Sequence, residues 1–261
     1  MDAVFLYPVT SAQLVMEKRM EAISNNIANA DTVGFKRDTP VFSAKRPILS
    51  KAYSIGGAED PTGGKSLLPI PYFPVLDEVV TDFAQGIMKV TDNALDIGID
   101  GKGFFQVQTP SGVKYTRNGS FRLNNEGQVV TQSGYPVLGE GGVITLPSGK
   151  ITIDEEGRIS VKGEGVGPFV QVDLLALVTV DDLSKMKKVG DNLFELVNGN
   201  ATLAPEVRVR QGVLEGSNVN PMIEMVAMIS AVRHYESAQK AIQGADDIAQ
   251  RSVNQIGQLK A

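Results

Sequence analysis

Cysteine is absent from the 261 residues of the chain, and histidine occurs only once. Without cysteine the chain can form no disulfide and can hold no cysteine-ligated zinc or iron–sulfur cluster. A single histidine argues against histidine-rich metal sites and against most catalytic triads. We therefore expect no cofactor, no metal ion and no catalytic residues, and so a protein that is not an enzyme.

Long apolar runs are also missing, so no membrane-spanning segment is expected. The first eight residues lack a basic stretch before their short apolar run, which makes them a poor match to a cleaved secretory signal. The net charge of −5 lies in the middle, because residues 1–37 and 221–261 each carry four basic and four acidic side chains. This distribution does not indicate a nucleic-acid-binding surface, and the neutral ends favour apolar pairing.

The sequence from Pro221 to about Gln258 carries apolar residues at steps of three and four, which keeps one stripe on one face of a helix. Ser217 and Asn218 offer side-chain oxygens that can cap this helix, and Pro221 suits its first turn. At about 1.5 Å per residue, the helix would be roughly 55–60 Å long. Because a compact core does not cover a stripe of that length, we expect a partner helix.

The N-terminal part of the chain offers such a partner. Thr10 to Gln13 is typical of a capping box, and apolar residues follow at helical spacing until turn formers cluster between Asn29 and Gly34. We expect this helix to pair with the C-terminal one as in a coiled coil. The alternative is that both stripes pack on the middle of the chain.

Asparagine is unusually frequent near the end of the first helix. Asn25, Asn26 and Asn29 lie close together, although asparagine is a poor helix former. Two interpretations stay open: a frayed helix end, or hydrogen bonds from these amides to another chain. Gly34 is expected just beyond the helix end, with Phe35 as an apolar anchor.

Between the helical ends the composition changes twice. Six of the thirteen prolines lie between Pro40 and Pro74, together with several glycines, which predicts an extended arm or linker. From Glu78 to about Arg210, short β-rich runs, among them Val170–Val180, alternate with turn pairs such as Asn118-Gly119 and Glu156-Gly157. Short strands at this spacing are typical of antiparallel hairpins. A short helical turn is expected within residues 181–186.

These patterns predict an α+β fold class, with paired, coiled-coil-like N- and C-terminal helices plus a β-rich middle domain of antiparallel hairpins. The expected domains are a helical domain made of residues 1–37 and 221–261, a Pro/Gly-rich extended arm or linker at residues 38–75, and a β-rich domain at residues 76–220.

Motifs that resemble active sites fail on their spacing. Gly63-Gly64-Lys65-Ser66 ends like a phosphate-binding loop, but the upstream position that requires glycine is Glu59, and no apolar strand precedes it. Glu155 and Glu156 are adjacent and would point to opposite faces of a strand, so they form no acid–base pair. The sequence therefore offers no catalytic constellation.

Three stretches together resemble the rod and hook proteins of the bacterial flagellum. The stretches run from Ser24 to Arg37, from Leu95 to Phe121 and from Gly212 to Glu236. Their characteristic motifs are Asn25-Asn26-Ile27-Ala28-Asn29, Gly103-Phe104-Phe105, Arg117-Asn118-Gly119 and Leu214-Glu215-Gly216-Ser217-Asn218. Each motif alone could arise by chance, but the three stretches in this order are specific.

The resemblance implies a structural subunit of the flagellar basal-body rod. In that family, the terminal helices form an inner tube and the β-rich domain lies outside it. The implied assembly is a hollow helical shaft that transmits torque and passes export substrates. A proximal-rod type is favoured, and a distal-rod type is the alternative.

The resemblance also implies the partners and the location. The expected partners are other copies of the chain, neighbouring rod proteins and, during secretion, the flagellar export apparatus, with no nucleic acid and no membrane insertion. The expected location is the basal-body rod, which spans the periplasm, after export without a cleaved signal peptide.

On this interpretation, the subunit interface combines apolar packing with polar contacts that set the register between chains. The predicted interface residues are Met16, Met20, Ile23, Asn25, Asn26, Ile27, Asn29, Gly34, Phe35, Asn218, Asn220, Met225, Ile229, Val232, Tyr235, Ile242 and Val253. Two functions of other classes stay open: a cell-wall glycan-acting enzyme with helical arms, and a secreted adaptor that forms a small defined oligomer.

Overall fold

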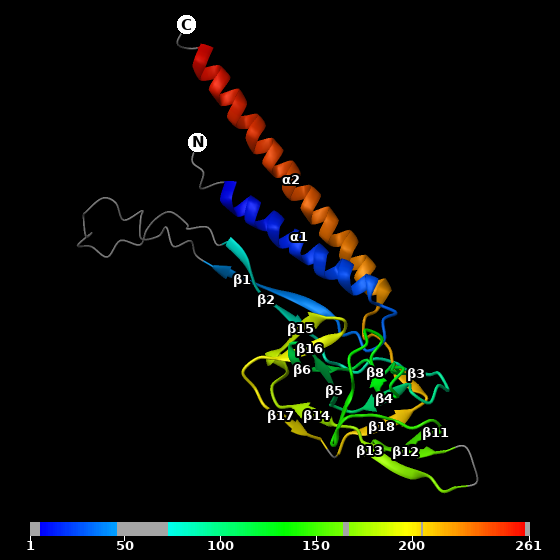
Figure 1. Ribbon diagram of the computed structural model, residues 1–261. Helices are drawn as coiled ribbons and strands as arrows, with labels where there is room; N and C mark the ends of the chain where they lie inside the picture. Colours follow the sequence, from blue (N-terminus) through cyan, green and yellow to red (C-terminus); the bar gives the residue numbers. More distant parts are fainter. Residues whose placement is uncertain (1–5, 46–72, 164–166, 205, 259–261) are drawn as a thin grey trace, which may run out of the picture. The chain divides into compact units, whose positions relative to one another are not determined.

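A computed structural model describes residues 6–45, 73–163, 167–204 and 206–258 of the chain (Figure 1). The chain divides into two compact units. The helical unit comprises Met1–Ile27, Asp38–Val80 and Pro221–Ala261, and the β-rich unit comprises Ala28–Arg37 and Thr81–Asn220. Residues 28–37 are thus grouped with the β-rich unit, whereas the sequence pattern assigned them to the helical domain.

The helical unit contains α1 (Leu6–Ala28) and α2 (Pro221–Gln258), together with a two-stranded sheet of β1 (Asp38–Lys45) and β2 (Phe73–Thr81). The predicted bounds of α2 are confirmed. The predicted capping box at Thr10 is wrong, because α1 begins at Leu6 and Thr10 lies inside it. Pro8 is tolerated there, since the first turn of a helix needs no intrahelical N–H partner.

The two helices meet where α1 ends and α2 begins. The Asn26 Nδ2 atom donates to Glu224 Oε2 at 3.4 Å, and both side chains are buried. Val15, Ile23 and Ala231 are also buried. Coiled-coil pairing further along the two helices stays a prediction.

The expected arm at residues 38–75 lies partly outside the described residues. Its two ends form the strands β1 and β2, so they are extended, as the proline-rich composition predicts. The glycine-rich motif at residues 63–66 lies outside the described residues.

Most of the β-rich unit consists of short strands joined by tight turns, and each pairing described within it is antiparallel, which confirms the hairpin prediction. Its strands are β3 (Met88–Val90), β4 (Ile97–Asp100), β5 (Phe104–Thr109), β6 (Gly112–Thr116), β7 (Arg122–Leu123), β8 (Val129–Val130), β9 (Leu138–Gly139), β10 (Gly142–Val143), β11 (Lys150–Ile153), β12 (Arg158–Lys162), β13 (Val170–Leu174), β14 (Leu177–Val180), β15 (Met186–Gly190), β16 (Leu193–Leu196), β17 (Ala201–Leu203), β18 (Arg208–Gln211) and β19 (Val213–Glu215). The predicted helical turn is a 3₁₀ turn, η3, at Leu183–Lys185.

A six-stranded sheet in the order β15-β16-β6-β5-β14-β17 organises the β-rich unit. Successive side chains of a strand point to opposite faces, so Phe104 and Phe105 of β5 enter two different apolar clusters. Phe105 lies in the larger cluster with Ile99 and Val107, whereas Phe104 packs with Phe194 in the smaller one. The sheet therefore has a core on each face.

Two strand predictions needed correction. The run from Val170 to Val180 was expected as one strand, but it divides into β13 and β14, which belong to different sheets. The hairpin of β15 and β16 was not predicted. It turns through Asp191 and Asn192, whose φ angles of 49° and 56° are left-handed. Asparagine and aspartate tolerate this conformation, but without a neighbouring Asn-Gly pair the turn was not recognised.

Candidate functional site

Helix α2 carries apolar side chains on two opposite faces. One face is directed inward and includes the buried Glu224 and Ala231 and the half-buried Tyr235 and Ile242. At about 100° per residue, Ile229 lies on the other face. Its side chain is 55% exposed. One apolar face is enough for an amphipathic helix to pack in its own chain. Packing within this chain therefore does not explain why α2 has a second apolar face.

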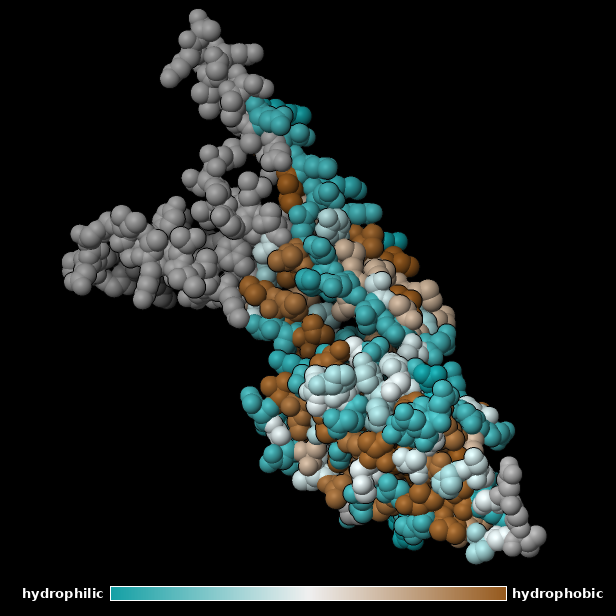
Figure 2. Space-filling view, in the orientation of Figure 1, coloured by the Kyte–Doolittle hydropathy of each residue, from teal (hydrophilic) through white to brown (hydrophobic). Residues whose placement is uncertain are grey.

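The second face is confined to the first turns of α2. Its exposed apolar residues are Met222, Met225, Val226, Ile229 and Val232. Further along the same face the side chains are polar, as at Arg233, Glu236 and Lys240. Brown, apolar side chains lie at the surface along α2 in Figure 2. Such a contiguous exposed patch is typical of a protein-binding surface. We call these five residues the apolar face of α2.

The predicted interface residues fall into three groups by exposure. The exposed ones are Asn25, Asn220, Met225, Ile229 and Val232, and the half-buried ones are Met16, Met20, Ile27, Asn29, Asn218, Tyr235 and Ile242. Ile23, Asn26, Gly34 and Phe35 are buried, and the side chain of Val253 lies outside the described residues. Whether any of them contacts another chain stays a prediction.

Several of these residues make contacts within their own chain. The side chain of Asn26 accepts from the backbone N–H of Asp38 and donates to its carbonyl, both at 2.9 Å, which ties the end of α1 to β1. Gly34, Phe35 and Asn218 lie in the β-rich unit, at a cluster of buried charges.

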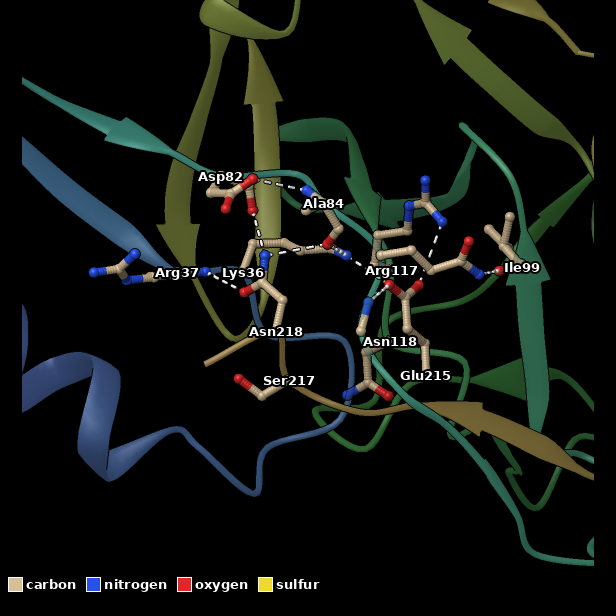
Figure 3. A network of polar contacts seen from close by, with 12 residues as sticks. Lys36, Arg37, Asp82, Ala84, Ile99, Arg117, Asn118, Glu215, Ser217 and Asn218 are labelled. Carbon is tan, nitrogen blue, oxygen red and sulfur yellow. Dashed lines mark hydrogen bonds and ion pairs between the residues drawn. The ribbon is translucent and has the colours of Figure 1, made fainter. Parts of the chain in front are cut away.

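The centre of that cluster is the carboxylate of Glu215, at the end of β19 (Figure 3). Lys36 Nζ donates to Glu215 Oε1 at 2.5 Å, and Arg117 Nη1 donates to Glu215 Oε2 at 3.3 Å. All three side chains are buried. The backbone N–H of Gly86 gives Glu215 Oε1 a further donor at 2.9 Å. The carboxylate therefore holds two cations and one backbone amide.

The two cations also reach backbone carbonyls. Lys36 Nζ donates to the carbonyl of Ala84 at 2.8 Å, and Arg117 Nη2 donates to the carbonyl of Gly101 at 2.7 Å. The guanidinium of Arg117 lies 5.1 Å from the ring centroid of Phe104, on the smaller apolar cluster. These partners offset part of the large cost of removing the charges from water.

The backbone on both sides of Lys36 is held against the residues around Glu215. Gly34 N donates to the carbonyl of Glu215 at 2.8 Å, and Arg37 N donates to Asn218 Oδ1 at 2.7 Å. We call residues 34–37 and 215–218, together with Arg117, the clasp. It joins a segment that follows α1 to a segment that precedes α2.

Side chains from the β15–β16 hairpin cover the clasp. Lys188 lies with its Nζ 3.9 Å from the ring centroid of Phe35 and also donates to the carbonyl of Lys36. Asn192 Nδ2 donates to the carbonyl of Val33 at 3.1 Å. The segment from Val33 to Arg37 is thus enclosed on several sides, although it is not a strand of any sheet.

The burial of the clasp changes its electrostatics. Desolvation lowers the pKa of Lys36 below its ordinary value, against the opposing attraction of Glu215. Desolvation also lowers the pKa of Arg117, again against Glu215. For both cations, desolvation has a larger effect on the pKa than the attraction of Glu215. The clasp is therefore an energetically costly arrangement that depends on all its partners being in place.

Sequence reasoning did not find the clasp. Lys36, Arg117 and Glu215 each stood inside a motif, but no local pattern indicates that they meet. The available signal was Glu215, a charged residue between Leu214 and Gly216 in an otherwise apolar strand. Such a residue is either on an exposed face or paired in the interior.

Two other kinds of feature are absent from the described residues. They contain no group of three or more histidine, cysteine, aspartate or glutamate side chains placed to hold a metal ion. Across the same residues, neither helix is long and apolar enough to cross a membrane. Two features of the described residues therefore stand out: the exposed apolar face of α2 and the buried clasp.

Comparison with known protein families gives three matches along the chain. Residues 10–36 match the family described as flagella basal body rod protein, and residues 98–161 match the flagellar hook protein FlgE/F/G D1 domain. Residues 210–256 match the flagellar basal body rod FlgEFG protein C-terminal family. Each of the three buried charges of the clasp lies in a different matched segment.

Curated proteins resemble the chain over nearly its whole length. The FlgF flagellar basal-body rod protein of Caulobacter vibrioides is 35% identical over 97% of this chain and 98% of its own. The FlgG protein of Buchnera aphidicola is 36% identical over 89% of this chain and 92% of its own. The FlgF protein of Escherichia coli is 33% identical over 96% of this chain and 97% of its own.

Proposed function

The chain belongs to the flagellar basal-body rod protein family, and from this premise we propose that its copies and neighbouring rod proteins join through the apolar face of α2. The chain is a structural subunit of the flagellar rod and not an enzyme. The alternative of a glycan-acting enzyme with helical arms is therefore not favoured.

The observation that carries the proposal is the second apolar face of α2. Met222 is 75% exposed and Val226 is 68% exposed, so these side chains stand in water in the single chain. At about 25 cal/mol per Å² of apolar area removed from water, covering such a face favours association. A neighbouring helix with a similar stripe is the partner that fits it, as in helix-to-helix packing.

Contacts of this kind would generate a filament if they are heterologous. In a heterologous contact, the face of one copy binds a different surface of the next, so the assembly extends instead of closing. We propose that the result is a hollow shaft across the periplasm that transmits torque and passes export substrates, and that the export apparatus delivers the chain. The family membership supports this proposal.

Within the family, we propose the FlgF or proximal-rod type, with the FlgG or distal-rod type as the alternative. The support is the FlgF relative that matches 97% of the chain. The FlgG relatives have similar identities, so a functional test must separate the two. Expression of this chain should restore motility to cells that lack FlgF and not to cells that lack FlgG. The reverse result would assign the distal-rod type.

Replacing Ile229 with aspartate tests the assembly surface. The change places a charge on the apolar face of α2, and we expect it to abolish rod assembly, because an unpaired charge in an apolar interface is strongly unfavourable. The β-rich unit should stay folded. Incorporation into rods is measured in isolated basal bodies, and folding is measured by amide exchange.

The matched control is Ser237→Asp. Ser237 is exposed on the polar continuation of the same face. The Ser237→Asp substitution adds the same charge outside the apolar face of α2, and we expect this variant to assemble normally. If Ile229→Asp also assembles normally, the proposed surface is wrong.

A further inference from the structure

The clasp binds together two parts of the chain that are far apart in sequence. Lys36 and Glu215 are separated by 179 residues, and Arg117 and Glu215 by 98. We propose that the clasp acts as a gate in folding: the β-rich unit completes its folding only when the Val33–Arg37 segment and Glu215 have been joined. The inference concerns the β-rich unit alone and does not depend on the assembly surface.

An open clasp would be energetically costly. If residues 33–37 leave, Glu215 loses its 2.5 Å contact with Lys36, and its carboxylate keeps only the longer 3.3 Å contact with Arg117 and the Gly86 amide. The buried Glu215 Oε1 atom would then accept only from the Gly86 amide, and a buried carboxylate that loses a short charged partner is costly. An open clasp inside an otherwise intact unit is therefore strongly disfavoured.

The clasp also joins several separate segments of the β-rich unit. Besides the bonds to residues 215–218, the Arg37 carbonyl accepts from Asp82 N at 2.8 Å. Asn218 Nδ2 donates to the carbonyls of Asp82 and Ala84 at 2.8 and 3.1 Å. Val33 is bound from the β15–β16 hairpin. Releasing residues 33–37 thus removes hydrogen bonds from three distant parts of the unit at once.

The clasp is in direct contact with the core of the β-rich unit. Arg117 lies over Phe104, whose ring centroid is 5.6 Å from that of Phe83 and 6.0 Å from that of Phe194. The backbone of Gly34 lies so close to Arg117 and Asn118 that an added Cβ would come within 2.5 Å of Asn118 N. Opening the clasp would therefore uncover the smaller apolar cluster.

The order of folding follows from the sequence distances. The β5–β6 and β11–β12 hairpins pair residues that are close in the chain, so they can form early at low entropic cost. The clasp must close a much longer loop, which costs more chain entropy before it gains any contact. Closure of the clasp is thus the step that completes the unit and requires the chain to be present through Glu215.

The test is native-state amide hydrogen exchange on the full-length wild-type chain, measured by NMR at increasing denaturant concentration. The clasp amides are those of Gly34 and Arg37. The reference amides are those of Val129 and Val137, which are buried and hydrogen-bonded in the larger apolar cluster at 3.0 and 2.8 Å. A gate predicts that all four amides exchange with the same opening constant and the same denaturant dependence.

The contrary result is equally clear. If Gly34 and Arg37 exchange through a smaller opening while Val129 and Val137 stay protected, the clasp opens locally and the proposal is overturned. This measurement needs no variant, so it stays decisive even if a clasp variant fails to fold.

A matched pair of substitutions extends the test. Glu215→Gln removes the charge of the clasp with little change of shape, and we expect exchange at all four amides to accelerate by one common factor of about 100 or more. Glu156→Gln makes the same change in a half-exposed ion pair with Arg158 and Arg208, and should accelerate exchange by less than about fivefold. Acceleration by Glu215→Gln at Gly34 and Arg37 alone would contradict the gate.

Discussion

At the scale of single residues, Gly34 occupies a position that a side chain would disturb in two ways. Its φ angle of +69° is left-handed, and a Cβ atom would lie 2.5 Å from Asn118 N and 2.6 Å from the carbonyl carbon of Arg117. Position 34 therefore requires glycine for a reason that the sequence did not reveal. The end of α1 alone would favour glycine at this position. In the folded chain, close packing against Arg117 and Asn118 is a second reason for it.

Gly34→Ala should destabilise the β-rich unit by more than about 3 kcal/mol, because the left-handed strain of about 1–2 kcal/mol adds to the steric overlap. Gly112→Ala is the control. Gly112 also has a positive φ, of +107°, but open space lies around it, so strain alone should act. Denaturant unfolding monitored on the β-rich unit measures both. Equal losses would show that the packing at Gly34 does not matter.

The pKa of Lys36 makes the stability of the β-rich unit depend on pH. Desolvation lowers this pKa in the folded chain, so between the lowered value and the ordinary value of 10.5 the unfolded chain binds more protons than the folded one. The contribution of Lys36 to the free energy of unfolding is therefore most favourable above pH 10.5. It decreases as the pH falls from 10.5 through the pKa that Lys36 has in the folded chain.

The comparison of wild type with Lys36→Met isolates this effect. Methionine cannot titrate, so we expect the free energy of unfolding of the wild type, relative to that of Lys36→Met, to increase as the pH rises from 7 toward 10.5. Other lysines titrate equally in both proteins and cancel. Denaturant unfolding at a series of pH values measures the difference. A difference that does not change with pH would mean that Lys36 titrates at its ordinary value when folded.

At the scale of elements, α2 is a long helix with an uneven sequence. Its inward face and its first turns are apolar, but apart from the exposed Ile248 its later part is mostly polar outside. That later part contains Gly244, which has open space around it. Glycine in a helix interior loses more chain entropy on folding than alanine. The second half of α2 should therefore be the less stable half of the helix.

Gly244→Ala should stabilise the second half of α2 by about 0.5–1 kcal/mol, because alanine restricts the unfolded chain and fits the helix. Amide exchange along residues 240–250 measures the effect. The reverse change nearby, Ala241→Gly at an exposed position, should destabilise the same region by a similar amount. A destabilising effect of Gly244→Ala would indicate that residue 244 is not helical in solution.

At the scale of the whole molecule, each of the two units buries its own apolar residues. The described part of the helical unit buries few apolar side chains, among them Val15, Ile23 and Ala231, whereas the β-rich unit contains two apolar clusters. The free energy gained by apolar burial is thus concentrated in the β-rich unit. On the assembly that we propose, neighbouring subunits would cover the apolar face of α2 and so add to the burial of the helical unit.

We expect the free chain to unfold in two steps, with the helical unit unfolding at the lower temperature. Gly34→Ala should lower the midpoint of the β-rich step and leave that of the helical step unchanged. Calorimetry combined with circular dichroism at 222 nm separates the steps, since the helices dominate that signal. A single transition that moves as a whole in Gly34→Ala would show that the units unfold together.

The sequence by itself determined the local features of this protein. The bounds of α2 follow from an unbroken apolar stripe after Ser217 and Asn218, and the β11–β12 hairpin follows from apolar alternation around Glu156-Gly157. Such signals depend on residues a few positions apart, so they can be read along the chain. The family, too, could be inferred from short motifs, since their order along the chain was enough.

Only the tertiary structure decided which distant residues meet. Nothing near Lys36 or Glu215 indicates that they form one ion pair, and nothing in Val170–Val180 shows that it divides between two sheets. The buried Phe35 and the exposed Ile229 look alike in a sequence, because both are large apolar residues and the sequence does not show what covers them. Burial and pairing depend on how the folded chain brings separated segments together, and that is a property of the whole fold and not of any stretch within it.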